Sequence, residues 1–167
     1  GPGGGDRASA DLADLDLDLT GRHDVVVTEM GTNQPGDIAY LCGIAQPTHG
    51  MITNIGRDHL GDFGSRSLDE LMNIKWIVSR AVRDSGTLIL NADDAHLVAR
   101  AGDYPGAMAW FSLQPSNPVV RSHVDNGGTA YVLQDGDLMR FEGSESKRIC
   151  AAADIPITLQ GAARHNT

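Results

Sequence analysis

Short apolar runs alternate with segments of helical periodicity in the first two thirds of the chain. Val25, Val26 and Val27 form a β-branched run that is typical of a strand covered on both faces. Residues 50–54 and 87–91 are two further runs of this kind. Because strands alternate here with helical segments, the pattern predicts right-handed crossovers and a parallel sheet.

The predicted helices lie between and after these strands, at residues 33–44, 67–83 and 94–100. The first has Pro35 in its opening turn, where a missing backbone N–H costs nothing. The second begins with a capping box, because Ser67 and Glu70 are three residues apart. We expect Gly86 to end it.

Beyond Pro115 the pattern changes to short segments separated by turn residues. The predicted strands of this part are residues 119–124, 129–133 and 138–141. The sequences Asn126-Gly127-Gly128 and Asp135-Gly136 between them are hairpin signals. The chain thus divides into three predicted parts: a linker or incomplete N-terminal segment (1–22), an α/β core (23–114) and an antiparallel meander (115–167). Within the first part, residues 11–19 alternate leucine and aspartate, which fits either a solvated strand or a short acidic helix.

Composition narrows the possible partners. The formal net charge of −9 disfavours binding to nucleic acid or to an anionic membrane surface. No run approaches the roughly 18 apolar residues of a membrane helix. Cys42 and Cys150 have apolar neighbours and no metal-type spacing, so we interpret them as buried thiols of a cytoplasmic protein.

Lys75 occupies an unexpected position in the helix predicted over residues 67–83. The apolar residues of this segment recur at helical spacing: Leu68, Leu71, Met72, Val78 and Val82. A period of 3.6 residues places Lys75 in the middle of that stripe. A lysine shielded from water loses its proton more easily, because a low dielectric disfavours the ammonium form. Lys75 therefore either snorkels to the surface or takes part in chemistry.

Polar residues follow the carboxyl end of each predicted parallel strand: Glu29, then Thr53 and Asn54, then Asn91, Asp93 and Asp94. Ligands of open α/β sheets bind outside the carboxyl ends of the strands. His59 lies in the loop that follows the second strand, so it belongs to the same edge.

A metal site would unite three of these side chains. A neutral Lys75 can add carbon dioxide and become a carbamate, an oxygen ligand similar to a carboxylate. Together with Glu29 and His59 it would suit a Mg²⁺ ion that bridges nucleotide phosphates. Each residue also has a plainer interpretation, in which Lys75 snorkels, His59 bonds its own loop and Glu29 caps a helix.

The order of these motifs resembles the Mur ligase family, the ATP-dependent amide ligases of peptidoglycan synthesis and their cyanophycin- and folate-related relatives. The matching segments are TEMGTNQPGDI (28–38), ITNIGRDHL (52–60), FGS (63–65), LNADD (90–94) and IPITL (155–159), followed by Gly161 and His165-Asn166. The resemblance runs from about Asp24 to the last residue. It implies the P-loop-NTPase-like fold of the family's central ATP-binding domain.

Two branches of the family share features with this sequence. Residues 28–38 are similar to the branch that adds D-alanyl-D-alanine to a UDP-muramoyl tripeptide, whereas the long meander and residues 155–166 resemble cyanophycin-synthetase-like members. The resemblance implies that ATP activates a substrate carboxylate as an acyl phosphate, which an amine then attacks with release of phosphate. The implied substrates are small molecules, such as a UDP-muramoyl peptide and an amino acid or dipeptide.

The resemblance also implies roles for individual residues. Glu29 would hold a magnesium ion at the β- and γ-phosphates, and His59 with carbamylated Lys75 would hold a second. The implied nucleotide-binding residues are Asn54, Asp58, His165 and Asn166. We interpret the turn at residues 91–94 as structural.

The family's phosphate loop, glycine-threonine-asparagine-glycine-lysine-threonine, has no counterpart among these residues. Neither the glycine-rich residues 1–5 nor residues 31–35 contain its lysine. We therefore expect a ligase central domain without its phosphate-loop segment and C-terminal domain, with little activity by itself. The alternative is a non-catalytic module that binds a nucleotide or a partner. A carbamate-bridged metal hydrolase is disfavoured, because no His-x-His pair is present.

Overall fold

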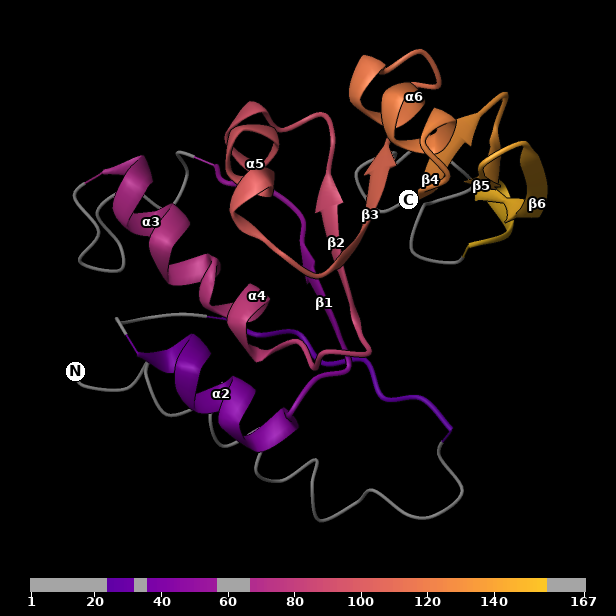
Figure 1. Ribbon diagram of the computed structural model, residues 1–167. Helices are drawn as coiled ribbons and strands as arrows, with labels where there is room; N and C mark the ends of the chain where they lie inside the picture. Colours follow the sequence, from indigo (N-terminus) through magenta and orange to yellow (C-terminus); the bar gives the residue numbers. More distant parts are fainter. Residues whose placement is uncertain (1–23, 32–35, 57–66, 156–167) are drawn as a thin grey trace. The chain divides into compact units, whose positions relative to one another are not determined.

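The computed structural model describes residues 24–31, 36–56 and 67–155 (Figure 1). The chain forms two compact units. The first comprises Gly1–Gly50 and Ile55–Gly86, and the second comprises Met51–Asn54 and Thr87–Thr167. None of the helices in the described part has the length and apolar character that crossing a bilayer requires.

Helices and strands alternate along the described chain. The helices are α2 (Asp37–Ala45), α3 (Leu68–Lys75), α4 (Ile77–Ala81), α5 (Ala95–Arg100) and α6 (Pro118–Asp125), with 3-10 turns η2 (Ala101–Asp103) and η3 (Ala152–Asp154). The strands are β1 (His49–Ile52), β2 (Thr87–Asn91), β3 (Ala107–Ser112), β4 (Thr129–Gln134), β5 (Asp137–Glu142) and β6 (Glu145–Ala151).

The strands form one sheet in the order β1-β2-β3-β4-β5-β6. Strand β3 runs parallel to β2 and to β4, whereas β5 runs antiparallel to β4 and to β6. The predicted α/β fold, a mostly parallel sheet with an added antiparallel meander, is confirmed.

The core of the second unit is mostly aliphatic, in keeping with an aromatic content of only 5%, and Trp110 is its buried tryptophan. Helix α5 packs on β2, and α6 packs on β3 and β4. The largest fully buried side chains of this unit are Leu88, Leu90, Leu97 and Val132. Strand β2 spans the predicted residues, and helix α5 begins at Ala95, after the cap residue Asp94.

The first unit contains two of the predicted helices. Helix α2 begins at Asp37, after Gly36, whose φ of 104° is accessible to glycine, and it packs against α4. The predicted opening turn with Pro35 lies outside the described residues. At the start of α3 the Glu70 backbone N–H donates to Ser67 Oγ at 3.2 Å, so the N-cap hydrogen bond of the predicted capping box is confirmed.

The prediction of a single helix over residues 67–83 is wrong, because the helix is interrupted at Trp76. Ser79 donates twice to the Trp76 carbonyl, from its hydroxyl at 2.7 Å and from its backbone N–H at 3.0 Å. A serine hydroxyl that bonds a carbonyl of the preceding turn bends a helix. Helix α3 therefore ends at Lys75, and α4 ends before Val82, whose backbone is extended.

The strand predicted at residues 119–124 is also wrong, since these residues belong to α6. The Asn117 side chain accepts hydrogen bonds from the backbone N–H groups of Val119 and Val120, and Pro118 fills the first helical position. This cap overrides the β-branched composition of the segment.

The glycines after α6 end the helix and do not form the predicted hairpin. Gly127, with φ of 85°, donates its backbone N–H to the Val124 carbonyl at 2.8 Å. Gly128 donates to the His123 carbonyl at 2.9 Å, which completes a Schellman motif. By contrast, the hairpin predicted at Asp135 and Gly136 is confirmed. Both residues have positive φ (52° and 87°), as a type I′ turn between antiparallel strands requires.

The strand predicted at Val25, Val26 and Val27 is absent from the described structure. The backbone there is irregular, and the three side chains are 77%, 45% and 90% exposed. A β-branched run becomes a strand only where neighbouring strands cover it, so composition alone does not suffice. Strands β3 and β6 were not predicted from the sequence.

Gly86 marks a close approach of two backbone segments in the first unit. A Cβ atom at this position would lie 1.6 Å from the Thr48 carbonyl oxygen. We expect Gly86→Ala to lower the free energy of unfolding by about 1–3 kcal/mol, because a backbone oxygen cannot move aside cheaply. Urea denaturation of the variant and the wild type measures this loss.

The matched control is Gly43→Ala, in α2. No heavy atom lies within 4 Å of a Cβ placed there, so alanine should stabilise the helix by up to about 1 kcal/mol. Equal urea midpoints for Gly86→Ala and the wild type would contradict the predicted clash.

An ion pair joins β5 and β6: Arg148 Nε lies 2.7 Å from Asp137 Oδ2. Its hydrogen bond lowers the pKa of Asp137 below the ordinary 3.8. A carboxylate with a lowered pKa stabilises the fold above its unfolded pKa, and this stabilisation is lost as the pH falls through the folded pKa. We expect Arg148→Ala to lower the Tm at pH 7, and this loss should shrink as the pH falls below 3.8 through the lowered pKa of Asp137. Lys147→Ala removes a neighbouring charge from the same exposed strand, so a loss with the same pH dependence in this control would contradict the assignment.

Candidate functional site

Three of the predicted site residues lie in the described part of the chain. Glu29 is exposed in an irregular segment, and Lys75 is the half-buried last residue of α3; both belong to the first unit. Asn54 is exposed, lies two residues after β1 and belongs to the second unit. The other predicted residues lie outside the described residues: Asp58, His59, His165 and Asn166.

Lys75 borders the buried side of α3. Leu71 and Met72, one turn earlier, are 0% and 7% exposed, and the adjacent Trp76 is 4% exposed. Residues three and four apart on a helix share a face, so Lys75 lies on the apolar face, as predicted. Its half-burial is compatible with both interpretations of this lysine.

The predicted metal ligands suit the ion in their chemistry. A carboxylate from Glu29 and a carbamate on Lys75 would supply hard oxygen ligands, which Mg²⁺ prefers, and His59 would add an imidazole. Within residues 24–31, 36–56 and 67–155, no group of three or more His, Cys, Asp or Glu side chains is arranged to hold a metal. The ligand set stays a prediction, because His59 lies outside these ranges.

Asn91 ties the chain after β1 to the turn after β2. Its amide nitrogen donates to the Thr53 carbonyl at 2.9 Å, and its amide oxygen accepts from the Asp93 backbone N–H at 2.8 Å. Only a side chain with both a donor and an acceptor can make this pair of bonds. The turn at residues 91–94 is therefore a structural connection, in agreement with the sequence interpretation.

The Asp93 carboxylate continues this connection to β3 and α6. It accepts from the Ser112 hydroxyl at 2.6 Å, the Leu113 backbone N–H at 2.7 Å and the Asn117 amide at 2.9 Å. Asn117 also donates to the Ala92 carbonyl at 3.0 Å. We call the side chains of Asn91, Asp93, Ser112 and Asn117 the edge network.

The sequence analysis missed two members of the edge network, Ser112 and Asn117. Asn117 had a usable signal, since asparagine directly before proline is a typical helix start. Ser112 had none, because its contact with Asp93 spans 19 residues.

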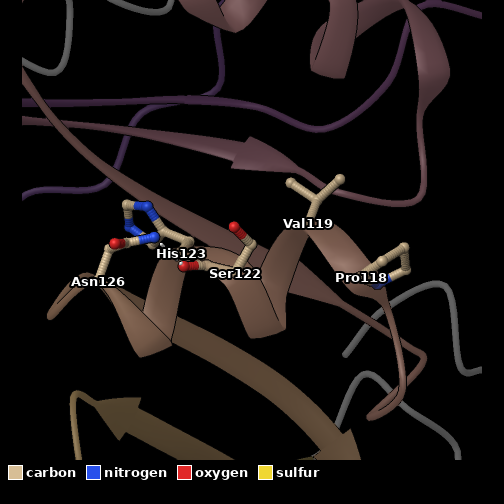
Figure 2. Close-up of a pocket in the computed structure, with 5 residues that line it drawn as sticks. All are labelled: Pro118, Val119, Ser122, His123 and Asn126. Carbon is tan, nitrogen blue, oxygen red and sulfur yellow. Dashed lines mark hydrogen bonds between the residues drawn. The ribbon is translucent and has the colours of Figure 1, made fainter.

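The described residues line two surface hollows, and none of these lining residues is a predicted site residue. One, of about 490 Å³, runs along α6 and is lined by Pro118, Val119, Ser122, His123 and Asn126 (Figure 2). All five side chains come from one helix and its cap, and the His123 ring lies 3.1 Å from the Met108 carbonyl oxygen.

The other hollow, of about 460 Å³, lies between α2 and α4 and includes Arg80 and Arg83. Arg83 donates to the Gln46 side chain at 3.3 Å. Cys42 lines the same hollow, and burial raises the pKa of its thiol, which makes it a poor nucleophile at neutral pH. Both cysteines are free; Cys42 is buried as expected, and Cys150 is half-buried.

Comparison with known proteins identifies the scaffold. The family model described as "Mur ligase middle domain" matches residues 8–158. The cyanophycin synthetase of Trichormus variabilis is 33% identical over 139 residues, which cover 83% of this chain and 15% of that protein. The UDP-N-acetylmuramoyl-tripeptide–D-alanyl-D-alanine ligase of Mycobacterium leprae is 40% identical over 85 residues, which cover 51% of this chain and 16% of that protein.

A solved structure supports the same fold. The crystal structure of MurF from Acinetobacter baumannii superposes with a TM-score of 0.60 and 23% identity, over 93% of this chain and 32% of that chain. The aligned residues cover about a sixth of the length of the two curated relatives named above. The match of the family model over most of the sequence shows that the chain belongs to the Mur ligase family, through its middle domain.

Proposed function

We propose that this chain is the nucleotide-binding part of an ATP-dependent ligase that joins a carboxylic acid to an amine. The observation that carries the proposal is the family match over residues 8–158. These residues include Glu29, Asn54, Asp58, His59 and Lys75, so most of the predicted site lies inside the matched region.

The proposed ligands are ATP and Mg²⁺. Glu29, His59 and carbamylated Lys75 would hold the metal, which when bound offsets negative charge on the phosphates. Asn54 and Asp58 would orient the nucleotide at the carboxyl edge of the sheet. This edge is where Asn54 is exposed to solvent in the second unit.

The proposed reaction joins two small molecules. The terminal phosphoryl group of ATP moves to a carboxylate oxygen of the acid, and ADP leaves. The amine then attacks the carboxyl carbon of this acyl phosphate, and phosphate leaves as the amide bond forms. The names of the relatives supply two candidate substrate sets, one of a cyanophycin synthetase and one of a peptidoglycan ligase that takes a UDP-muramoyl tripeptide. Free Cys42 and Cys150 suit a reducing compartment, so we place the reaction in the cytoplasm.

Lys75 offers the sharpest test, because alanine cannot form a carbamate. In the full-length protein that contains this chain, we expect Lys75→Ala to lower the rate of ADP release by about 100-fold or more. A coupled assay with ATP, Mg²⁺ and muramoyl-peptide or aspartate and arginine acceptors measures that rate. Intact-mass analysis of the wild type should show one added carbon dioxide, localised to Lys75.

The control variant is Lys147→Ala, which removes the other lysine of the chain from the exposed strand β6. We expect its rate to remain close to that of the wild type. Equal rates for Lys75→Ala and the wild type would contradict the assigned role. If the wild type binds the nucleotide but releases no ADP in the presence of any acceptor, the non-catalytic module is favoured instead.

A further inference from the structure

The chain leaves the sheet just before the predicted nucleotide contact. Strand β1 ends at Ile52, so Thr53 and Asn54 lie beyond its assigned residues. Asn54 is exposed. Backbone beyond a ladder keeps a fixed position only if other groups hold it. A group that holds Thr53 therefore helps to set the position of the residue that would orient a nucleotide.

The Asn91 amide supplies such a hold. Its 2.9 Å hydrogen bond reaches the carbonyl of Thr53, which is covalently joined to the nitrogen of Asn54. Asn91 itself is fixed at its other end by the Asp93 backbone N–H. The contact with Thr53 spans 38 residues, so no local turn could provide it.

The remainder of the edge network fixes the turn that contains Asn91. Ser112 and Asn117 donate to the exposed Asp93 carboxylate and are themselves only 2% and 8% exposed. Breaking either bond would take an acceptor away from a buried donor, which is costly. Through this network, the backbone at Thr53 is connected to the end of β3 and the start of α6, within the second unit.

We propose that Asn91 is a positioning residue, which fixes the backbone at Thr53 so that Asn54 meets the nucleotide in a set orientation. The inference rests on the proposed function, because it needs ATP at this edge of the sheet. Asn91 acts through Thr53 and makes no contact with the nucleotide itself.

The test compares two variants of the full-length protein that each remove bonds from the edge network. Asn91→Asp keeps an acceptor for the Asp93 backbone N–H but removes the donor to Thr53 and places a carboxylate beside that carbonyl. Ser112→Ala removes the hydroxyl that donates to Asp93 and leaves the bond between Asn91 and Thr53 in place. Thermal denaturation reports how much stability each variant loses.

Two readouts separate positioning from stability. We expect Asn91→Asp to raise the KM for ATP about tenfold or more. Ser112→Ala leaves two donors to Asp93 and the bond between Asn91 and Thr53, so it should raise the KM much less at a similar loss of Tm. Amide hydrogen exchange at residues 53–55 should likewise be accelerated far more in Asn91→Asp than in Ser112→Ala. This second readout does not depend on activity.

The outcomes distinguish this inference from the function on which it rests. Wild-type ADP release with an equal ATP KM in both variants would overturn the positioning role alone. Unchanged exchange at residues 53–55 in Asn91→Asp would overturn it as well. No ADP release from the wild type with any acceptor would overturn the proposed function and this role with it, whatever the exchange data show.

Discussion

The Asp93 carboxylate is the interaction on which the carboxyl edge of the sheet depends. Residues from the end of β3 and the start of α6 donate to its oxygens, and Asn91 joins the same turn to Thr53. Parallel strands need such a device, because ladder hydrogen bonds stop at the strand ends and leave backbone groups to be satisfied there. Side chains complete the bonding that the ladder cannot.

This constraint also distinguishes Asp93, whose carboxylate holds the fold, from the exposed Asn54. Asp93 accepts from three donors, so its oxygens are already engaged in holding the fold. Asn54, only one residue beyond the pinned Thr53 carbonyl, keeps its side chain exposed. A rigid support beneath an exposed polar residue is the arrangement that a binding edge needs, because a positioned group loses less entropy when a ligand arrives.

Two errors in the sequence predictions have a common cause. Composition suggested strands at residues 119–124 and at Val25, Val26 and Val27, but strand formation depends on neighbours that a local pattern does not contain. Two signals that act through local hydrogen bonds were confirmed. The capping hydrogen bond at Ser67 and the turn at Asp135 and Gly136 each satisfy backbone groups within a few residues. Asn117 and Pro118 are another local signal for a helix start, but the strand was predicted there from the β-branched composition.

The sequence by itself determined the fold class, the family and the chemical types of the candidate site, because strand and helix periods and motif order are properties of the chain alone. Glu29, His59 and Lys75 were identified in that way, and their meeting at one ion stays a prediction. Only the tertiary structure decided that Ser112 and Asn117 bind Asp93 and that Asn91 holds Thr53. Those contacts join residues 19 to 38 positions apart, and the fold of the backbone decides which of these residues lie close together.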